Sequence, residues 1–155
     1  MLSERNRIGL LGGNGFVGSI INKELNAISP SRKDVDITLK YQVEEWIENL
    51  RSDTVVLTAA YTDTKNAYLQ EDLARMINVF GVRVVAEAAR KFNKHVIFIS
   101  TGFVFTGEVR NPGPYCEDED PELGDPAQRG VYAATKLEGE KVLKDVLGED
   151  CYCQD

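Results

Sequence analysis

Short apolar runs of strand length recur along the chain, each bounded by glycine or polar residues. Three of them show no polar alternation, which is typical of strands buried on both faces. They are RIGLL at 7–11, TVVLTAA at 54–60 and HVIFIST at 95–101. A weaker extended piece covers 27–29 and stops at Pro30, and the tail GEDCYCQD begins like one more strand.

Between these runs, apolar residues recur every three or four positions, which is the spacing of one helix face. The pattern predicts helices starting near Gly15 and covering 16–25, 43–50, 69–92 and 131–147. From Gly107 to Gly130 the periodicity disappears, and this stretch carries Pro112, Pro114, Pro121 and Pro126 with the acidic run 117–120. We interpret it as a long surface loop.

The order of the elements predicts the fold class. Buried strands separated by helices form a parallel sheet covered by helices, an α/β doubly wound arrangement of the Rossmann-like kind. We find no internal repeat and no linker, so we expect residues 1–155 to form one domain. In such a sheet, ligands bind beyond the carboxyl ends of the strands.

Composition narrows the class of protein. The chain has 155 residues, 43% of them hydrophobic and 28% charged, with a net charge of −7. These values are typical of a globular cytoplasmic protein and argue against nucleic acid or an anionic membrane as a partner. We expect Cys116, Cys151 and Cys153 to be reduced thiols. Because His95 is the only histidine, triads and zinc sites that need several imidazoles are excluded.

The first run ends in LGGNGFVG, where Gly12, Gly15 and Gly18 form a G-x-x-G-x-x-G pattern. Gly13, Gly15 and Gly18 also satisfy G-x-G-x-x-G. Glycines here permit a tight turn and a close approach of the backbone to a pyrophosphate, and the following helix presents free N–H groups to it. Because the pattern lies between a strand and a helix, it predicts a dinucleotide site.

The segment SPSRKDVDIT indicates which dinucleotide binds. NAD sites place a carboxylate on the ribose 2′-hydroxyl, whereas NADP sites place a cation near the 2′-phosphate. Here Arg32 and Lys33 precede Asp34 and Asp36. We therefore expect NADP (NADPH), with NAD possible; the alternative is a basic turn on the surface.

Tyr132 and Lys136 stand four residues apart on the last predicted helix, so they share one face. An ammonium beside a phenol favours loss of the phenol proton, which suits proton transfer at neutral pH. Taken alone, the spacing occurs far more often on a solvated helix face than in a catalytic site.

The ordered segments RIGLLGGNGFVG, DVDIT, LTAAYTD, FISTGFVFTG and YAATKLEGE resemble the extended short-chain dehydrogenase/reductases, and within them the dTDP-4-dehydrorhamnose reductases. The likeness covers nearly the whole chain. It implies NADPH-dependent reduction of a nucleotide-linked 4-keto-6-deoxy sugar. It also implies a catalytic trio of Thr101 (with Ser100 beside it), Tyr132 and Lys136.

The resemblance assigns further roles. Tyr132 would protonate the carbonyl oxygen, Thr101 would stabilise the alkoxide, and Lys136 would hold the nicotinamide ribose. The cofactor would contact Gly12, Asn14, Gly15, Phe16, Val17, Gly18, Arg32, Asp36, Ile37, Ala59, Ala60, Tyr61, Thr62, Tyr132 and Lys136. Alternatively, Ile37 and Ala59 are plain core residues, and Thr62 is a helix N-cap.

Two departures from the family pattern affect the expected function. Relatives usually read S-T-D-Y-V-F where this chain has STGFVF, so Gly102 and Phe103 replace an aspartate and a tyrosine. The chain also ends at Asp155, about halfway along a relative, without the C-terminal substrate-binding part. Three hypotheses follow: the reductase itself, a non-catalytic dinucleotide-binding or regulatory module, and an inactive truncated product. A homodimer or a protein partner is possible.

Overall fold

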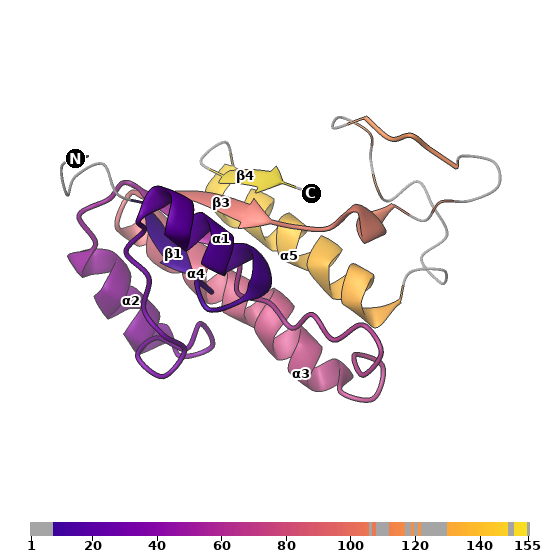
Figure 1. The fold of residues 1–155 in the computed structure, drawn as a ribbon, viewed down its shortest axis with the longest axis horizontal. Coiled ribbons are helices and arrows are strands. Elements are labelled where there is room, and N and C mark those ends of the chain that lie inside the picture. Colours follow the sequence, from indigo (N-terminus) through magenta and orange to yellow (C-terminus); the bar gives the residue numbers. More distant parts are fainter. Residues whose placement is uncertain are drawn as a thin grey trace.

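The computed structural model describes residues 8–105, 107, 112–116, 119, 121, 130–148 and 151–154. Its described part contains one sheet of four parallel strands in the order β1-β2-β3-β4 (Figure 1). The strands are β1 (Gly9–Leu11), β2 (Thr54–Leu57), β3 (His95–Ile99) and β4 (Cys151–Gln154). The predicted doubly wound parallel sheet is confirmed, and the strand expected in the tail is β4.

The path of the chain creates a reversal beside β1. After β1 the chain runs outward to Ile28, which pairs in parallel with Gly9 through an isolated bridge. It then returns across β1 to β2 on the other side, where Leu10 lies in register with Val56. The connection after β1 therefore runs toward Ile28 on one side of β1, and the connection after β2 runs toward β3 on the other side. Such a switch point opens a crevice at the carboxyl ends of the two strands.

The predicted helices are present, with shifted bounds. They are α1 (Phe16–Leu25), α2 (Lys40–Asn49), α3 (Glu71–Arg75), the π-helix η2 (Met76–Gly81), α4 (Val82–Lys91), the 3₁₀ turn η3 (Gly102–Val104) and α5 (Val131–Leu147). In Figure 1, α1 lies in front of β1, and α4 and α5 lie behind the sheet. None of the described helices is long and apolar enough to cross a membrane.

One face of the sheet carries the main core. Alternate strand residues, including Leu57 and Phe98, are 0–1% exposed on this face and pack against α2, α4 and α5. Val85 of α4 and Leu143 of α5 are equally buried. Burying one such side chain stabilises the fold by roughly 1.5–3 kcal/mol relative to exposing it. This face therefore fixes the sheet on which the strand ends are presented.

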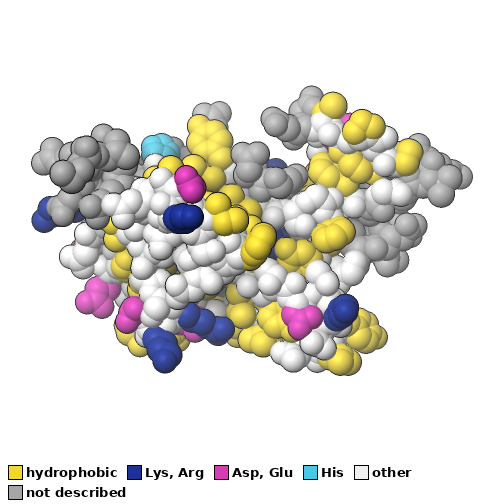
Figure 2. Space-filling model, in the orientation of Figure 1, with side chains coloured by type: hydrophobic (Ala, Val, Ile, Leu, Met, Phe, Trp, Pro, Cys, Tyr) yellow, Lys and Arg dark blue, Asp and Glu magenta, His cyan; other side chains and the backbone are white. Residues whose placement is uncertain are grey.

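In the described part of the chain, the opposite face is covered at β1 and β2 and becomes exposed toward β4. Leu10, Val56, Ile97 and Tyr152 are in register across the four strands. Their exposure rises from 0% at Leu10 and 6% at Val56 to 65% at Tyr152. Figure 2 shows apolar side chains open on this face. Among the described helices, α1 packs on this side of the sheet against β1.

The long helix expected over 69–92 differs from the prediction in its middle. Residues 71–91 are helical, but Met76–Gly81 is π-helical. The apolar side chains Leu73, Met76 and Phe80 are 40–48% exposed, whereas Asn78 is 1% exposed. The helix turns a narrow surface toward α5, where an added β-carbon on Gly139 would lie 2.5 Å from the Asn78 carbonyl oxygen. Close approach of the helices therefore overrides the apolar stripe.

Three strands are shorter than predicted, and the described part of the run 7–11 is a strand only from Gly9. The run 54–60 is a strand only to Leu57, because the N–H groups of Thr58 and Ala59 both donate to the Leu11 carbonyl. The run 95–101 is a strand only to Ile99. Residue 7 and most of the loop predicted over 107–130 lie outside the described residues.

Candidate functional site

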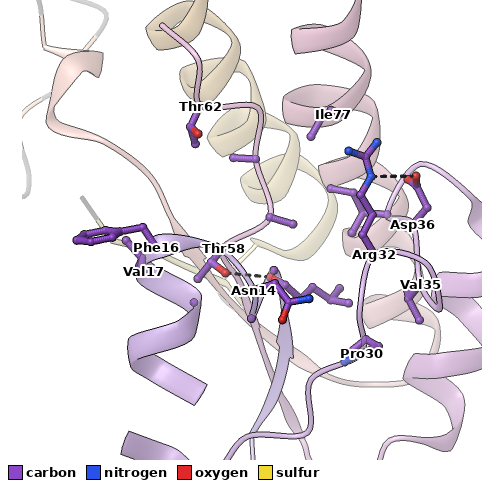
Figure 3. Close-up of a pocket in the computed structure, with 18 residues that line it drawn as sticks. Asn14, Phe16, Val17, Pro30, Arg32, Val35, Asp36, Thr58, Thr62 and Ile77 are labelled. Atoms are coloured by element: carbon purple, nitrogen blue, oxygen red, sulfur yellow. Dashed lines mark hydrogen bonds and ion pairs between the residues drawn. The ribbon is translucent and has the colours of Figure 1, made fainter. Parts of the chain in front are cut away.

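A cavity of about 480 Å³ opens at the carboxyl ends of β1 and β2, in the crevice that the switch point creates (Figure 3). Three segments form its walls: the β1–α1 turn, the segment after Ile28, and the segment after β2. Its lining residues are Leu11, Gly12, Gly13, Asn14, Gly15, Phe16, Val17, Gly18, Pro30, Arg32, Val35, Asp36, Ile37, Thr58, Ala59, Ala60, Thr62 and Ile77. The structure thus brings together nearly all of the cofactor residues expected from the sequence.

Some glycines of the β1–α1 turn are required by the fold, whereas another leaves its side-chain position to the cavity. Gly12 has φ +101°, and an added β-carbon there would lie 2.4 Å from the Ala59 nitrogen. A β-carbon on Gly18 would lie 2.2 Å from the Gly12 carbonyl oxygen. At Gly15, however, the nearest atom would be the Gly12 oxygen at 3.3 Å. The fold itself requires glycine at 12 and 18, whereas at Gly15 the missing side chain leaves room in the cavity.

The N-terminus of α1 faces this cavity without a side-chain cap. Gly15 is the N-cap residue, no side chain bonds to it, and the first turn has no acidic residue. The first N–H groups of a helix lack intrahelical acceptors and carry the positive end of its dipole. The turn is therefore suited to bind an anion such as a pyrophosphate.

Arg32 and Asp36 face each other on another wall of the cavity (Figure 3). The Arg32 Nε lies 3.5 Å from an Asp36 oxygen, and the Arg32 side chain is 74% exposed. Partial burial alone would raise the pKa of Asp36. Hydrogen bonds from the backbone N–H and hydroxyl of Thr38, together with the charge of Arg32, outweigh it and hold that pKa below its usual value.

The turn before Arg32 is held by its own side chains. An Asp34 oxygen accepts hydrogen bonds from the Ser31 hydroxyl at 2.6 Å and from the Ser31 backbone N–H at 3.1 Å. The hydroxyl bond is the larger cause that lowers the pKa of Asp34. Because Ser31 holds Asp34, this carboxylate is turned into the loop. Lys33 is exposed and does not line the cavity.

The segment after β2 forms the third wall. The Thr58 hydroxyl donates to the Leu11 carbonyl at 3.1 Å, which closes the base of the cavity between β1 and β2. Ala60 and Thr62 line the cavity, but Tyr61 does not. Thr62 is not a helix N-cap, since α3 begins at Glu71 and its N-cap is Gln70.

Ile37 and Ala59 fit both of the roles considered for them. Ile37 is 6% exposed and belongs to the core cluster, against which Ala59 also packs. Both residues line the cavity as well. The core at this edge of the sheet therefore continues into an apolar cavity wall.

The expected catalytic trio does not line this cavity. Lys136 is 2% exposed. Its ammonium donates to the Ile99 carbonyl at 2.6 Å and lies 3.8 Å from the centre of the Phe98 ring. The Thr101 hydroxyl accepts from the Phe103 N–H at 3.3 Å, and Tyr132 is half-buried one turn before Lys136.

The two positions that depart from the family pattern, Gly102 and Phe103, both lie at the surface. Phe103 is 66% exposed. An added β-carbon on Gly102 would meet no atom within 4 Å. The space beside Thr101 is therefore open in the described structure.

Several residues of the site do not follow from the sequence patterns. Leu11, Pro30, Val35, Thr58 and Ile77 line the cavity, and Asn78 supports its wall. Thr58 was open to prediction, because it follows a buried strand at its carboxyl end. Ile77 and Asn78 lie in the π-helix, which no local pattern indicated. The three cysteines are thiols, and the described residues contain no cluster of side chains suited to a metal ion.

Comparison with known proteins identifies the family. The model of the family described as "RmlD substrate binding domain" matches residues 6–152. The chain is 34% identical over 110 residues to dTDP-4-dehydrorhamnose reductase of Aggregatibacter actinomycetemcomitans. This match covers 71% of the chain and 35% of the relative. It is 30% identical over 150 residues to the Mycobacterium tuberculosis protein of the same name, covering 92% of the chain and 47% of the relative.

Solved structures agree with these sequence matches. The dTDP-4-dehydrorhamnose reductase of Bacillus anthracis, solved in complex with NADP, superimposes with a TM-score of 0.83 at 31% identity. The match covers 95% of this chain and 51% of that one. The Clostridium acetobutylicum orthologue gives a TM-score of 0.82 at the same identity and coverage. The chain spans a third to a half of the length of the curated relatives it matches, and it belongs to the RmlD substrate binding domain family.

Proposed function

We propose that this chain binds NADPH and provides the cofactor-binding half of a reductase that acts on a nucleotide-linked 4-keto-6-deoxy sugar. The observation that carries the proposal is the cavity at the switch point between β1 and β2. It joins a glycine turn that is open at Gly15, an uncapped helix N-terminus and the exposed cation of Arg32. Residues 1–155 would act as one cofactor-binding domain.

The residues of the cavity fit each part of NADPH. The α1 N-terminus, with Asn14, Gly15, Phe16 and Val17, would bind the pyrophosphate. Arg32 would bind the 2′-phosphate, since its guanidinium reaches the cavity and can form paired hydrogen bonds with phosphate oxygens. Asp36 and Ile37 would lie against the adenine. The segment from Ala59 to Thr62 would follow the ribose on the nicotinamide side.

The chemistry would take place beyond this cavity, at the end of β3 and the start of α5. NADPH, when bound, supplies the hydride. Tyr132 would donate a proton to the sugar carbonyl oxygen, and the Thr101 hydroxyl would donate a hydrogen bond to the same oxygen as charge develops. An ammonium has three N–H donors, and the Ile99 carbonyl takes one of those of Lys136. Lys136 would also lie beside Tyr132 and bind the nicotinamide ribose.

A second function is favoured by the position of the trio. Lys136 is 2% exposed, and none of the trio lines the cavity. A chain that binds a dinucleotide and acts through a partner protein or a second copy needs the cavity but not an accessible Tyr132. This alternative is a regulatory binding module with no turnover.

Two measurements test these functions. Calorimetric titration with NADPH tests the cofactor cavity that both functions require. Loss of nicotinamide absorbance in the presence of dTDP-linked 4-keto-6-deoxy sugars tests the reductase. NADPH binding with turnover that Tyr132→Phe abolishes supports the reductase, whereas binding without turnover supports the binding module. Absence of NADPH binding would contradict both.

A further inference from the structure

The end of β3 is held by two side chains of α5 that lie one turn apart. The Lys136 ammonium lies over the Phe98 ring and donates to the Ile99 carbonyl. The next residue, Ser100, donates its hydroxyl to the Glu140 carboxylate. The consecutive residues Phe98, Ile99 and Ser100 are thus each in contact with α5, the first two through Lys136 and the third through Glu140.

All polar members of this contact are buried. Lys136 is 2% exposed, Glu140 5% and Ser100 9%. A buried carboxylate is costly unless it is hydrogen-bonded, and an apolar side chain of similar volume often stabilises a fold as well or better. Packing alone therefore does not account for a glutamate at this position. What a buried polar contact adds over an apolar one is a fixed distance and direction between the groups it joins.

The two segments that this contact joins carry the residues of the proposed reaction. Thr101 directly follows Ser100, and its backbone is extended with φ −160° before the η3 turn. Tyr132 lies one turn before Lys136 on α5 and two turns before Glu140. A shift of the β3 end along α5 would move the Thr101 hydroxyl relative to the Tyr132 phenol. Errors of about 1 Å in such a placement reduce rates strongly.

We propose that Ser100 and Glu140 form a positioning pair, which sets the place of Thr101 against Tyr132 and Lys136 and so shapes the region that receives the nicotinamide end of the cofactor. This inference rests on the proposed function. Neither residue touches the cofactor cavity, since neither lines it. Ser100 would act through Thr101, the next residue in the chain. Glu140 would act through Lys136, one helical turn before it on α5.

The test compares two ligands of the same chain. NADPH reaches both ends of the cofactor site, whereas adenosine 2′,5′-bisphosphate has the adenine and the 2′-phosphate but no nicotinamide ribose. We expect Ser100→Ala, which removes the hydrogen bond to Glu140, and Glu140→Gln, which replaces a charge-assisted bond by a weaker neutral one, to raise the Kd of NADPH about tenfold, because the Thr101 region is then held less firmly. The Kd of the bisphosphate should change less than about twofold. Ser100→Thr, which keeps the hydroxyl, should bind NADPH about as tightly as the unaltered chain does.

Leu143→Ala is the matched control, because Leu143 is buried on the same helix without a polar contact. It should lower the melting temperature and leave the ratio of the two Kd values unchanged. The inference is overturned if folded Glu140→Gln changes both Kd values by the same factor, or neither. If Ser100→Ala does not fold, Glu140→Gln and Ser100→Thr decide the question. If the unaltered chain binds the bisphosphate but not NADPH, the nicotinamide end is not received and the inference fails. If it binds neither ligand, the proposed function fails with it.

Discussion

Asn78 holds the backbone of Tyr61 by two hydrogen bonds, accepting from its N–H at 2.8 Å and donating to its carbonyl at 3.1 Å. The same amide donates to the Thr135 hydroxyl at 3.0 Å, which in turn donates to the Tyr132 carbonyl at 2.9 Å. One buried side chain of the π-helix therefore connects the cavity wall after β2 to the helix that carries Tyr132. π-Helical turns of this kind often mark functional sites.

Asn78→Leu should destabilise the chain by about 2–4 kcal/mol. The leucine has a similar volume, but it leaves the half-buried Tyr61 N–H and carbonyl without their partner, at roughly 1–3 kcal/mol for each group when fully buried. The Thr135 hydroxyl keeps its bond to the Tyr132 carbonyl. Urea unfolding measures the loss. Asn49→Ala, which removes an exposed amide bonded only to the Glu45 carbonyl, should change stability by less than about 0.5 kcal/mol. Equal effects of the two variants would contradict the role of Asn78.

Asp36 should make the stability of the chain depend on pH in the acid range. Its pKa is lower in the folded chain than in the unfolded chain, so the folded state binds this proton less readily. The stabilisation is complete above the unfolded value of about 4 and is lost as the pH falls below it toward the folded pKa.

Urea midpoints at pH 6 and pH 3 measure this dependence. Asp36→Asn should lose less stability between the two pH values than the unaltered chain does. Asp145→Asn removes an exposed carboxyl of α5 and should follow the unaltered chain. A pH dependence that is unchanged in Asp36→Asn would show that Thr38 and Arg32 do not stabilise the carboxylate.

Arg32→Ala should weaken binding of NADPH by about ten- to a hundredfold and leave binding of NADH nearly unchanged. A charge-assisted contact to the 2′-phosphate accounts for roughly 1.5–3 kcal/mol, and NADH lacks that phosphate. Lys33→Ala is the matched control, because Lys33 is the adjacent cation and does not line the cavity. It should change either affinity less than about threefold. Equal losses for both cofactors in Arg32→Ala would contradict the assignment of the 2′-phosphate.

The glycine turn and the order of the elements were predictable because they depend on local chemistry. A strand, a glycine turn and an amphipathic helix follow one another within 9–25, and the cavity is built where Gly12 and Gly18 permit close contact. Arg32 and Asp36 were predictable for the same reason, because they follow the short pairing of Ile28 with Gly9.

Asn78 and Glu140 could not be predicted in this way. Their functions depend on contacts with residues 17 and 40 positions away in the chain, which no local pattern encodes. The apolar stripe of 69–92 was misleading as well. The helix presents Ala74, Asn78 and Gly81 to its neighbours and leaves Phe80 46% exposed. Gly139 of α5 permits the close approach to Asn78, and Gly81 makes room for Ile37.

The 155-residue chain should bind NADPH but reduce 4-keto-6-deoxy sugars at less than about one turnover per second, a tenth of a typical enzyme rate. Holding the substrate carbonyl against both Tyr132 and the nicotinamide is worth up to roughly 7–11 kcal/mol of barrier. In the described structure the space beside Thr101 is open at Gly102. Nicotinamide absorbance, followed with a panel of dTDP-linked sugars, measures the rate. Turnover near ten per second that Tyr132→Phe abolishes would contradict this expectation.

Calorimetric titration of NADPH into the unaltered chain and into Gly15→Val tests most directly that the cavity at β1 and β2 is the cofactor site. The Gly15 backbone has φ −76°, which a valine can adopt. An added β-carbon would lie in tight contact with the Gly12 oxygen at 3.3 Å, so the turn must shift by a few tenths of an ångström to admit the valine, whose side chain then fills the cavity. Gly102→Ala, at an open position, controls for substitution itself, and a melting curve confirms folding. We predict saturable binding by the unaltered chain and Gly102→Ala, and at least a hundredfold loss, about 2.7 kcal/mol, in Gly15→Val. Equal NADPH affinity in folded Gly15→Val would contradict the account.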